Sequence, residues 1–376
     1  MDIIRKNRLK ANLALDDGTI FRGFGLGFPS RKVGEVVFNT GMVGYTESLT
    51  DPSYCGQILC FTYPLIGNYG VPNPSLKDNY GLPIGFESDN LQISGVIMHE
   101  LCNTPEHWAS IMSLDEWLKN GEVPGICGID TRELTKKIRT HGVMMGVLDV
   151  SEEMLTDNEL LNLIKKSQNY EEINFIENVS VKEPILYGNG ENVVVLIDCG
   201  VKINIIRELL RRDCKVIRVP YNMSSKDILK YNPKGVIVSN GPGNPKLCTR
   251  TVKTVQELFE TNVPMLGICL GTQIIALALG GNTFKLKYGH RGQNKPCLDM
   301  LSGKGYVTSQ NHGYSVDIDS LDNTGLRPWF INADDKTCEG LIHENGKCIS
   351  VQFHPEASPG PYDTEYVFDE FIRIMM

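Results

Sequence analysis

Regular alternation between apolar strands and helices in the second half of the chain constrains the fold most. Short apolar runs at residues 193–197, 215–219, 235–239 and 263–268 are separated by helix-like segments. Strands that alternate with helices of this length are typical of a doubly wound, mostly parallel α/β sheet. Ligands of such sheets bind at the carboxyl ends of the strands, so a functional site is expected at that edge.

The sequence divides into three parts. A length of 376 residues favours two hydrophobic cores over one. Residues 1–150 predict a β-rich α+β domain, with an Asp-Asp-Gly hairpin signal at 16–18. Residues 151–190 predict a connector that opens with a helix from 151 to about 166. Residues 191–376 predict the α/β domain.

Composition excludes several classes of function. The net charge of -8 argues against a nucleic-acid surface and a basic membrane patch. The 11 cysteines include no Cys-x-x-Cys pair, which indicates a reducing compartment and neither a disulfide framework nor a zinc site. No apolar stretch is long enough to span a bilayer, and residues 1–8 lead into no apolar signal core. We therefore expect a cytoplasmic protein that binds neither nucleic acid nor membranes.

One strand of the α/β domain runs into a turn with the sequence Gly267-Ile-Cys-Leu-Gly271, followed by a helix-like run. A strand, a sharp turn flanked by glycines and a helix form a nucleophile elbow, with Cys269 where hydrolases often carry serine. Glycines let a strained backbone approach its neighbours closely, and a helix N-terminus favours a thiolate. A buried, inert cysteine after a core strand is the alternative interpretation.

A cysteine nucleophile needs a base and a group that orients the base. Among the seven histidines, His354 follows the apolar strand 349–353 and precedes Pro355. Proline favours an extended conformation at the preceding residue, and in extended chain residues two apart point to the same side. We therefore expect Glu356 to lie beside His354. Taken alone, His-Pro-Glu is typical of a surface turn, but its pairing with Cys269 favours a triad.

Acyl chemistry also needs hydrogen-bond donors for an oxyanion. The backbone N–H of Leu270 follows the nucleophile and is the expected first donor. Gly241, in the Asn-Gly-Pro-Gly turn at 240–243, is the expected second, although such a turn can also be ordinary loop. His290 and His312 are interpreted as satisfied loop histidines. Because the sequence has no His-x-x-x-His spacing and no Cys/His cluster, we predict no metal site.

These motifs together resemble a known family. The segments 267–273, 354–356 and 240–243 are similar to the class I, or triad, glutamine amidotransferases, over about residues 190–376. The first half resembles the small subunits of carbamoyl-phosphate synthases. The segments that carry this second resemblance are 34–47, 50–54, 63–68, 128–135 and 289–292.

The resemblance implies a catalytic triad and a substrate site. Cys269 attacks the side-chain amide of L-glutamine, His354 transfers protons and Glu356 orients His354, by way of a glutamyl thioester that water hydrolyses. The residues implied to hold glutamine are Ser53, Gly241, Gly243, Leu270, Gln273, Asn311, Gly313 and Tyr314. Members commonly have Phe where this chain has Tyr314, and many have His where it has Lys295.

The resemblance also implies a partner. Ammonia passes within a complex to a large synthase subunit, which binds ATP and Mg²⁺ and makes carbamoyl phosphate from bicarbonate. We expect no cofactor in this chain, which has no Gly-x-x-x-x-Gly-Lys-[Ser/Thr] phosphate loop. The first domain is the expected contact with the large subunit. Regulation, the number of heterodimers and the choice between arginine and pyrimidine biosynthesis stay open.

Three other functions remain as alternatives. An amidotransferase subunit for anthranilate or another acceptor generally lacks a 150-residue N-terminal domain, so the first half argues against it. A γ-glutamyl peptidase would keep the same triad and prefer peptides to free glutamine. A non-catalytic regulatory subunit is the third, and the presence of Cys269, His354 and Glu356 argues against it.

Overall fold

The computed structural model describes residues 9–376, which form two compact units. The first unit runs to Asp78 and resumes over Pro83–Ile173, and the second comprises Asn79–Leu82 and Asn174–Met376. The division therefore falls inside the 151–190 segment that the sequence predicts to be a connector. Residues 1–8, where no signal core is expected, lie outside the described part.

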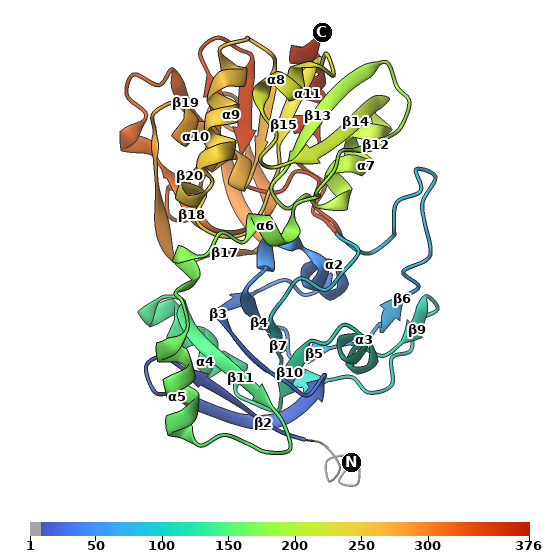
Figure 1. Cartoon of the computed structure of the whole chain (residues 1–376), viewed down its shortest axis with the longest axis vertical. Coiled ribbons are helices and arrows are strands. Elements are labelled where there is room, and N and C mark those ends of the chain that lie inside the picture. The colour runs from blue at the N-terminus through green and yellow to red at the C-terminus, as the bar shows by residue number, and fades with distance from the viewer. Residues whose placement is uncertain (1–8) are drawn as a thin grey trace. The chain divides into compact units, whose positions relative to one another are not determined.

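The first unit is built around a closed barrel with the strand order β1-β11-β3-β4-β7-β10-β2 (Figure 1). The neighbours β3–β4, β4–β7 and β7–β10 are parallel and the others antiparallel. The hairpin predicted at 16–18 joins β1 to β2. The barrel strands are β1 (Lys10–Leu15), β2 (Ile20–Gly27), β3 (Arg31–Asn39), β4 (Gln57–Phe61), β7 (Gly95–Ile97), β10 (Pro124–Cys127) and β11 (Met144–Val150).

Helices and short strands surround this barrel. Asp130 caps α4, since its carboxylate accepts from the backbone N–H of Glu133 at 2.8 Å. The helix expected from residue 151 begins later, because the side chain of Thr156 caps α5 in a capping box with Glu159. These elements are α2 (Tyr45–Thr50), α3 (Leu114–Asn120), α4 (Thr131–His141), α5 (Asp157–Lys166), the 3-10 helices η1 (Pro52–Tyr54) and η2 (Tyr170–Glu172), β5 (Leu65–Ile66), β6 (Val71–Pro72), β8 (Glu100–Leu101) and β9 (Ser110–Met112).

The second unit holds a ten-stranded sheet with the order β12-β14-β13-β15-β16-β21-β20-β19-β17-β18. The five strands from β14 to β21 are parallel to one another, as predicted, and both ends of the sheet are extended by antiparallel pairs. The strands are β12 (Ile185–Tyr187), β13 (Asn192–Asp198), β14 (Cys214–Pro220), β15 (Gly235–Val238), β16 (Met265–Ile268), β17 (Asn282–Asp299), β18 (Gly305–Asp317), β19 (Leu326–Asn332), β20 (Cys338–His343) and β21 (Cys348–Val351).

Helices cover both faces of the parallel strands, which confirms the α/β fold class (Figure 1). Val194 and Leu196 of β13 pack in one core with α7 and α11, whereas Val195 and Ile197 pack in another with α8, α9 and α10. Alternate residues of a strand point to opposite faces, so a strand buried on both sides is apolar throughout. The helices are α6 (Ile176–Val179), α7 (Ile203–Arg211), α8 (Ser225–Leu229), α9 (Thr249–Phe259), α10 (Leu270–Ala278), α11 (Tyr366–Met375), and the 3-10 helices η3 (Pro245–Leu247) and η4 (Ile318–Ser320).

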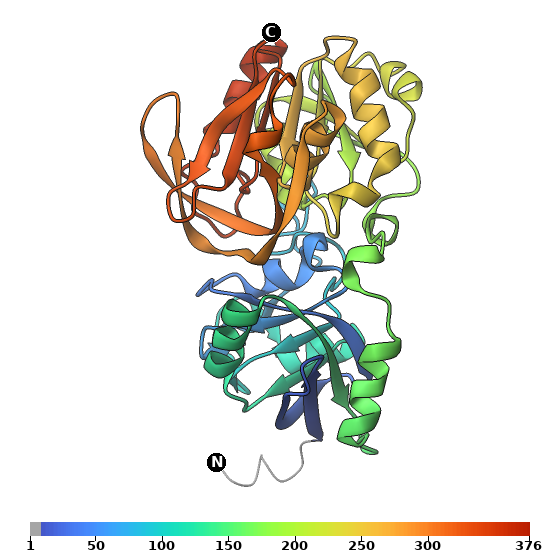
Figure 2. The same cartoon turned by 90° about the vertical axis from the view of Figure 1, so that its left-hand side faces the viewer.

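The antiparallel end of this sheet is dominated by the long strands β17 and β18, which run side by side in orange in Figure 2. Their register pairs His290 with His312 and Arg291 with Asn311. Within residues 9–376, none of the helices has the length and apolar character needed to cross a membrane.

Candidate active site

Cys269 occupies the turn between β16 and α10, as the motif predicts. Its backbone has φ 54° and ψ -104°, a strained conformation that costs of the order of 1–3 kcal/mol in a residue with a side chain. The flanking glycines are required by close backbone contacts. A Cβ atom on Gly271 would lie 2.0 Å from the carbonyl oxygen of Val238, and one on Gly267 would lie 2.8 Å from the carbonyl carbon of Gly271.

The thiol of Cys269 is buried, with 2% of the residue exposed. Its Sγ atom lies 3.7 Å from the backbone oxygen of Asn311 on β18. Since Cys269 is the N-cap residue of α10, the positive end of the helix dipole acts on the sulfur. This position is typical of a reactive cysteine.

The predicted base, His354, follows the strand next to the one that leads into Cys269. β21 pairs in parallel with β16, with Val351 opposite Ile268, and His354 lies three residues beyond that pair. The backbone oxygen of Val351 accepts from the N–H of Cys269 at 2.8 Å and from the hydroxyl of Thr272 at 2.7 Å. Adjacent parallel strands thus deliver Cys269 and His354 to the same edge of the sheet, where ligands of α/β folds bind.

His354 and Glu356 form the expected pair, because Nδ1 of His354 lies 2.7 Å from Oε1 of Glu356. Both side chains are buried. The prediction of an extended chain from His354 to Glu356 is wrong. Residues 355–356 form a turn, in which the N–H of Ala357 donates to the carbonyl of His354 at 3.2 Å. Proline's fixed φ suits such a turn, and the turn folds the carboxylate back onto the imidazole.

Lys202 is a buried cation at this site that none of the sequence motifs identifies. Its Nζ atom lies 3.0 Å from Oε1 of Glu356, and its side chain is only 6% exposed. Lys202 follows the carboxyl end of β13, and its N–H donates to Oδ1 of Asn240 at 3.2 Å. The available signal was position, since lysine side chains are rarely buried and this one lies at the functional edge of the sheet.

Burial and charge act in opposite directions on this pair. Burial alone would raise the pKa of Glu356, but the ammonium of Lys202 and the imidazole of His354 lower it to about 2. Burial alone would lower the pKa of His354, but the carboxylate raises it to about 10, with Lys202 opposing and Cys269 adding to the effect. The pair therefore favours a carboxylate beside an imidazolium.

The second ring nitrogen of His354 is available for proton transfer. Nε2 has no hydrogen-bond partner among residues 9–376, and the ring is fully buried. Cys269 interacts with the ring closely enough to raise the pKa of the imidazole. Nε2 is therefore the atom that would take a proton from the thiol.

The turn at 240–243 lies beside the elbow. A Cβ atom on Gly241 would lie 2.0 Å from the carbonyl oxygen of Cys199 and 2.9 Å from Cδ2 of Leu270. Gly243 has φ 89°, which favours glycine. The predicted glutamine-binding residues Gly241, Gly243 and Leu270 therefore belong to the same edge of the sheet as Cys269.

The other predicted glutamine-binding residues of this unit meet on β18. The amide nitrogen of Gln273, on α10, donates to the backbone oxygen of Tyr314 at 2.9 Å and to Oε1 of Gln352 at 3.1 Å. Asn311 and Gly313 precede Tyr314 on the strand. Ser53 lies on η1 of the first unit, where its N–H donates to Oδ1 of Asp51, and its part in glutamine binding stays a prediction.

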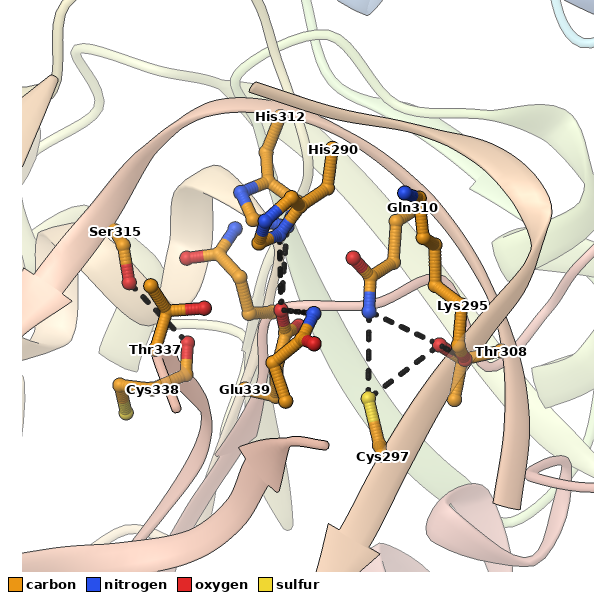
Figure 3. A network of polar contacts seen from close by, with 12 residues as sticks. His290, Lys295, Cys297, Thr308, Gln310, His312, Ser315, Thr337, Cys338 and Glu339 are labelled. Atoms are coloured by element: carbon orange, nitrogen blue, oxygen red, sulfur yellow. Dashed lines mark hydrogen bonds and ion pairs between the residues drawn. The ribbon is translucent and has the colours of Figure 1, made fainter. Parts of the chain in front are cut away.

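His290 and His312 are not isolated loop histidines. They face each other across β17 and β18 and meet Glu339 of β20 in a buried group (Figure 3). No sequence pattern predicts this group, because its members come from three different strands and no local spacing brings them together.

Two family models match the chain. "Carbamoyl-phosphate synthase small chain, CPSase domain" matches residues 13–148, and "Glutamine amidotransferase class-I" matches residues 195–374. The carbamoyl phosphate synthase small chain of Pyrococcus furiosus is 49% identical over 97% of this chain and 98% of that protein. The small chain of Saccharolobus solfataricus is 48% identical over 96% of both, and that of Methanopyrus kandleri 49% identical over 97% of this chain and 99% of that protein.

The chain belongs to the carbamoyl phosphate synthase small chain family. This membership confirms the resemblance seen in the sequence. The small-chain match covers the barrel unit with Ser53, and the amidotransferase match covers Cys269, His354 and Glu356. The two halves of this small chain thus correspond to the two matched domains.

Proposed function

We propose that this small chain hydrolyses L-glutamine at Cys269 and passes the ammonia to a large carbamoyl-phosphate synthase subunit. The arrangement of Cys269 on a strained elbow, with the buried His354–Glu356 pair at the end of the adjacent strand, carries the proposal. Family membership supports the choice of glutamine as substrate and of a synthase as partner.

The first half of the reaction forms a thioester. The Sγ atom of Cys269 bonds to the amide carbon of glutamine with its proton held on Nε2 of His354, in agreement with the raised pKa of that imidazole. The carbonyl oxygen becomes an oxyanion, for which the N–H groups of Leu270 and Gly241 are the proposed donors. The tetrahedral intermediate then collapses, the C–N bond breaks, and the imidazolium gives its proton to the departing nitrogen as ammonia forms.

The second half releases glutamate. His354 takes a proton from water, the hydroxide bonds to the thioester carbon, and the C–S bond breaks to restore Cys269. Glu356 stabilises the imidazolium that forms twice in this cycle, in agreement with the raised pKa of His354. Lys202 keeps Glu356 ionised in a buried place where a lone carboxylate would be costly.

The ammonia is used elsewhere. The large subunit is the proposed site for ATP, Mg²⁺ and bicarbonate, and we assign no cofactor of that reaction to this chain. This division explains why the sequence lacks a phosphate loop of the Gly-x-x-x-x-Gly-Lys type.

The test is Cys269→Ser in the complex with the large subunit. We expect glutamine-dependent carbamoyl phosphate synthesis to fall by at least about 10³-fold, because the nucleophile is lost, while synthesis from added ammonium continues. Cys102→Ser, at a half-buried free cysteine of the first unit, is the matched control and should leave both activities unchanged. Retained glutamine use in Cys269→Ser would refute the proposal.

The same assay separates the alternatives. Preference for γ-glutamyl peptides over free glutamine would favour a peptidase. Glutamine hydrolysis that supports another nitrogen acceptor but no carbamoyl phosphate would favour a different amidotransferase. A wild-type chain with no glutaminase activity in the complex would favour a regulatory subunit.

A further inference from the structure

Three side chains from three strands meet inside the antiparallel part of the second unit. His290 on β17, His312 on β18 and Glu339 on β20 each offer one ligand atom, and these atoms lie within 4.8 Å of one another (Figure 3). The exposed fractions are 6% for His290, 4% for His312 and 0% for Glu339. We call these three residues the histidine cluster.

Both imidazoles use their outer nitrogen to donate away from the cluster. Nε2 of His290 lies 2.8 Å from Oδ2 of Asp335, and Nδ1 of His312 lies 2.9 Å from the backbone oxygen of Tyr314. Histidines that bind metals usually donate their second nitrogen to a carboxylate or a backbone carbonyl, which fixes the ring and its tautomer. Nδ1 of His290, which lies 3.2 Å from Oε1 of Glu339, and Nε2 of His312 both point into the cluster.

Two polar atoms in the cluster lack a hydrogen bond. Since Nδ1 of His312 donates to a carbonyl, Nε2 of the neutral ring carries a lone pair, and it lies 3.7 Å from Oε1 of Glu339. Neither Nε2 of His312 nor Oε2 of Glu339 has a hydrogen-bond partner within residues 9–376. A lone pair that faces a carboxylate in a buried site is unfavourable, and a cation bound between the two groups would remove the conflict.

We propose that the histidine cluster binds a divalent late first-row transition ion, Zn²⁺ by its ligand chemistry. Two imidazoles and a carboxylate form a ligand set that zinc accepts, with a fourth position open to water. The ligand atoms are 3.2 Å apart for His290 and Glu339 and 3.7 Å apart for His312 and Glu339. Tetrahedral zinc with bonds of ~2.1 Å places neighbouring ligands about 3.4 Å apart.

The surroundings of the cluster support the same occupant. Asn332 donates to Oε1 of Glu339 at 3.1 Å and so fixes the carboxylate. Cys297 lies nearby, but its sulfur contacts Gln310 at 3.3 Å and Thr308 at 3.5 Å, as Figure 3 shows, so we do not assign it as a ligand. The ion would supply the contact that Oε2 of the buried Glu339 carboxylate lacks.

The role of the ion is to hold strands rather than to react. It would link β17, β18 and β20 through one side chain from each strand. His312 lies between Asn311 and Gly313, two residues of the proposed glutamine site. A bound ion here would differ from the prediction of no metal site. Its binding is measured without glutamine, so this proposal does not depend on the glutaminase proposal.

The experiment titrates the tag-free full chain, stripped with a chelator, with Co²⁺ followed by visible absorption. We expect one equivalent of Co²⁺ to bind and to give the strong visible absorption of a four-coordinate site. Zn²⁺ should displace the Co²⁺ and raise the Tm of the chain. Glu339→Gln should weaken Co²⁺ binding at least tenfold. Glu344→Gln, at an exposed acid just after β20, is the matched control and should bind as the wild type does. Equal binding by both variants, or no saturable binding by the wild type, would overturn the proposal.

A second measurement covers the case in which Glu339→Gln does not fold. X-ray absorption of the Zn²⁺-loaded wild type should show two imidazole ligands, one or more oxygens and no sulfur. A shell that contains sulfur, or one that lacks imidazole, would show adventitious binding elsewhere and would contradict the assignment.

Discussion

At the residue scale, the Glu356 carboxylate links the imidazole of His354 to the buried ammonium of Lys202 in the candidate active site. One of its oxygens contacts both Nδ1 of His354 at 2.7 Å and Nζ of Lys202 at 3.0 Å. The carboxylate compensates the charge of Lys202 when the imidazole is neutral and stabilises the imidazolium when it forms. Removing one member of such a buried group leaves the others uncompensated, which costs more than the group contributes when intact.

Glu356→Gln should therefore lower the free energy of unfolding by about 3 kcal/mol. The loss should be smaller in Glu356→Gln combined with Lys202→Met, because the double variant leaves no buried ammonium without a counter-charge. Thermal and urea unfolding of the four chains of this double-mutant cycle measure the coupling. Additive losses would show that Lys202 and Glu356 do not act as a pair.

The loss of unfolding free energy in Glu356→Gln should depend on pH. The depressed pKa of Glu356 contributes stability that is complete above about 4.5 and is lost as the pH falls toward 2. The raised pKa of His354 contributes stability that is complete below about 6.5 and is lost as the pH rises toward 10. The difference from wild type should thus be largest between pH 4.5 and 6.5, and a difference that is constant with pH would contradict this account.

At the scale of secondary structure, the turn between β16 and α10 depends on backbone packing that only glycine permits. Gly271→Ala should lower the free energy of unfolding by about 2–3 kcal/mol, since its Cβ would lie 2.0 Å from the carbonyl oxygen of Val238. Gly305→Ala, at a β18 position with nothing within 4 Å of the new Cβ, is the control and should be nearly neutral. Equal melting temperatures for the two variants would contradict the packing argument.

Much at this scale was predictable because the signals are local. The βα alternation predicted the strands β13, β14, β15 and β16 within a few residues, and the glycines around Cys269 predicted the elbow. The antiparallel strands beyond β21 follow no such alternation, so their pairing was not predicted. The same holds for the histidine cluster and Lys202, which depend on contacts between segments far apart in the sequence. The turn at Pro355 was missed because proline suits both extended chain and turns.

At the scale of the whole molecule, the chain crosses between the units more than once. Residues 79–82 belong to the second unit, although the first unit continues on both sides of them. Leu82 is 5% exposed and lies in the buried cluster that also contains residues of α7 and α11. The second unit is therefore completed by a segment that precedes it by about 90 residues in the sequence.

Leu82→Ala should lower the stability of the second unit by about 2–4 kcal/mol, because it opens a cavity in that core. Leu76→Ala removes a side chain that is 50% exposed and should have little effect. Hydrogen exchange resolved by unit measures the change, which should appear in β13 and α7 and not in the barrel. Loss of protection confined to the barrel strands would contradict the assignment of residues 79–82.

The central claim is that glutamine is hydrolysed through a thioester on Cys269. The most direct measurement is to quench the complex with acid during turnover of glutamine and to analyse its peptides by mass spectrometry. We predict a glutamyl adduct on the peptide that contains Cys269, absent when Cys269→Ser is treated in the same way. Steady glutamine hydrolysis with no adduct on Cys269, or with an adduct on another cysteine, would contradict the claim.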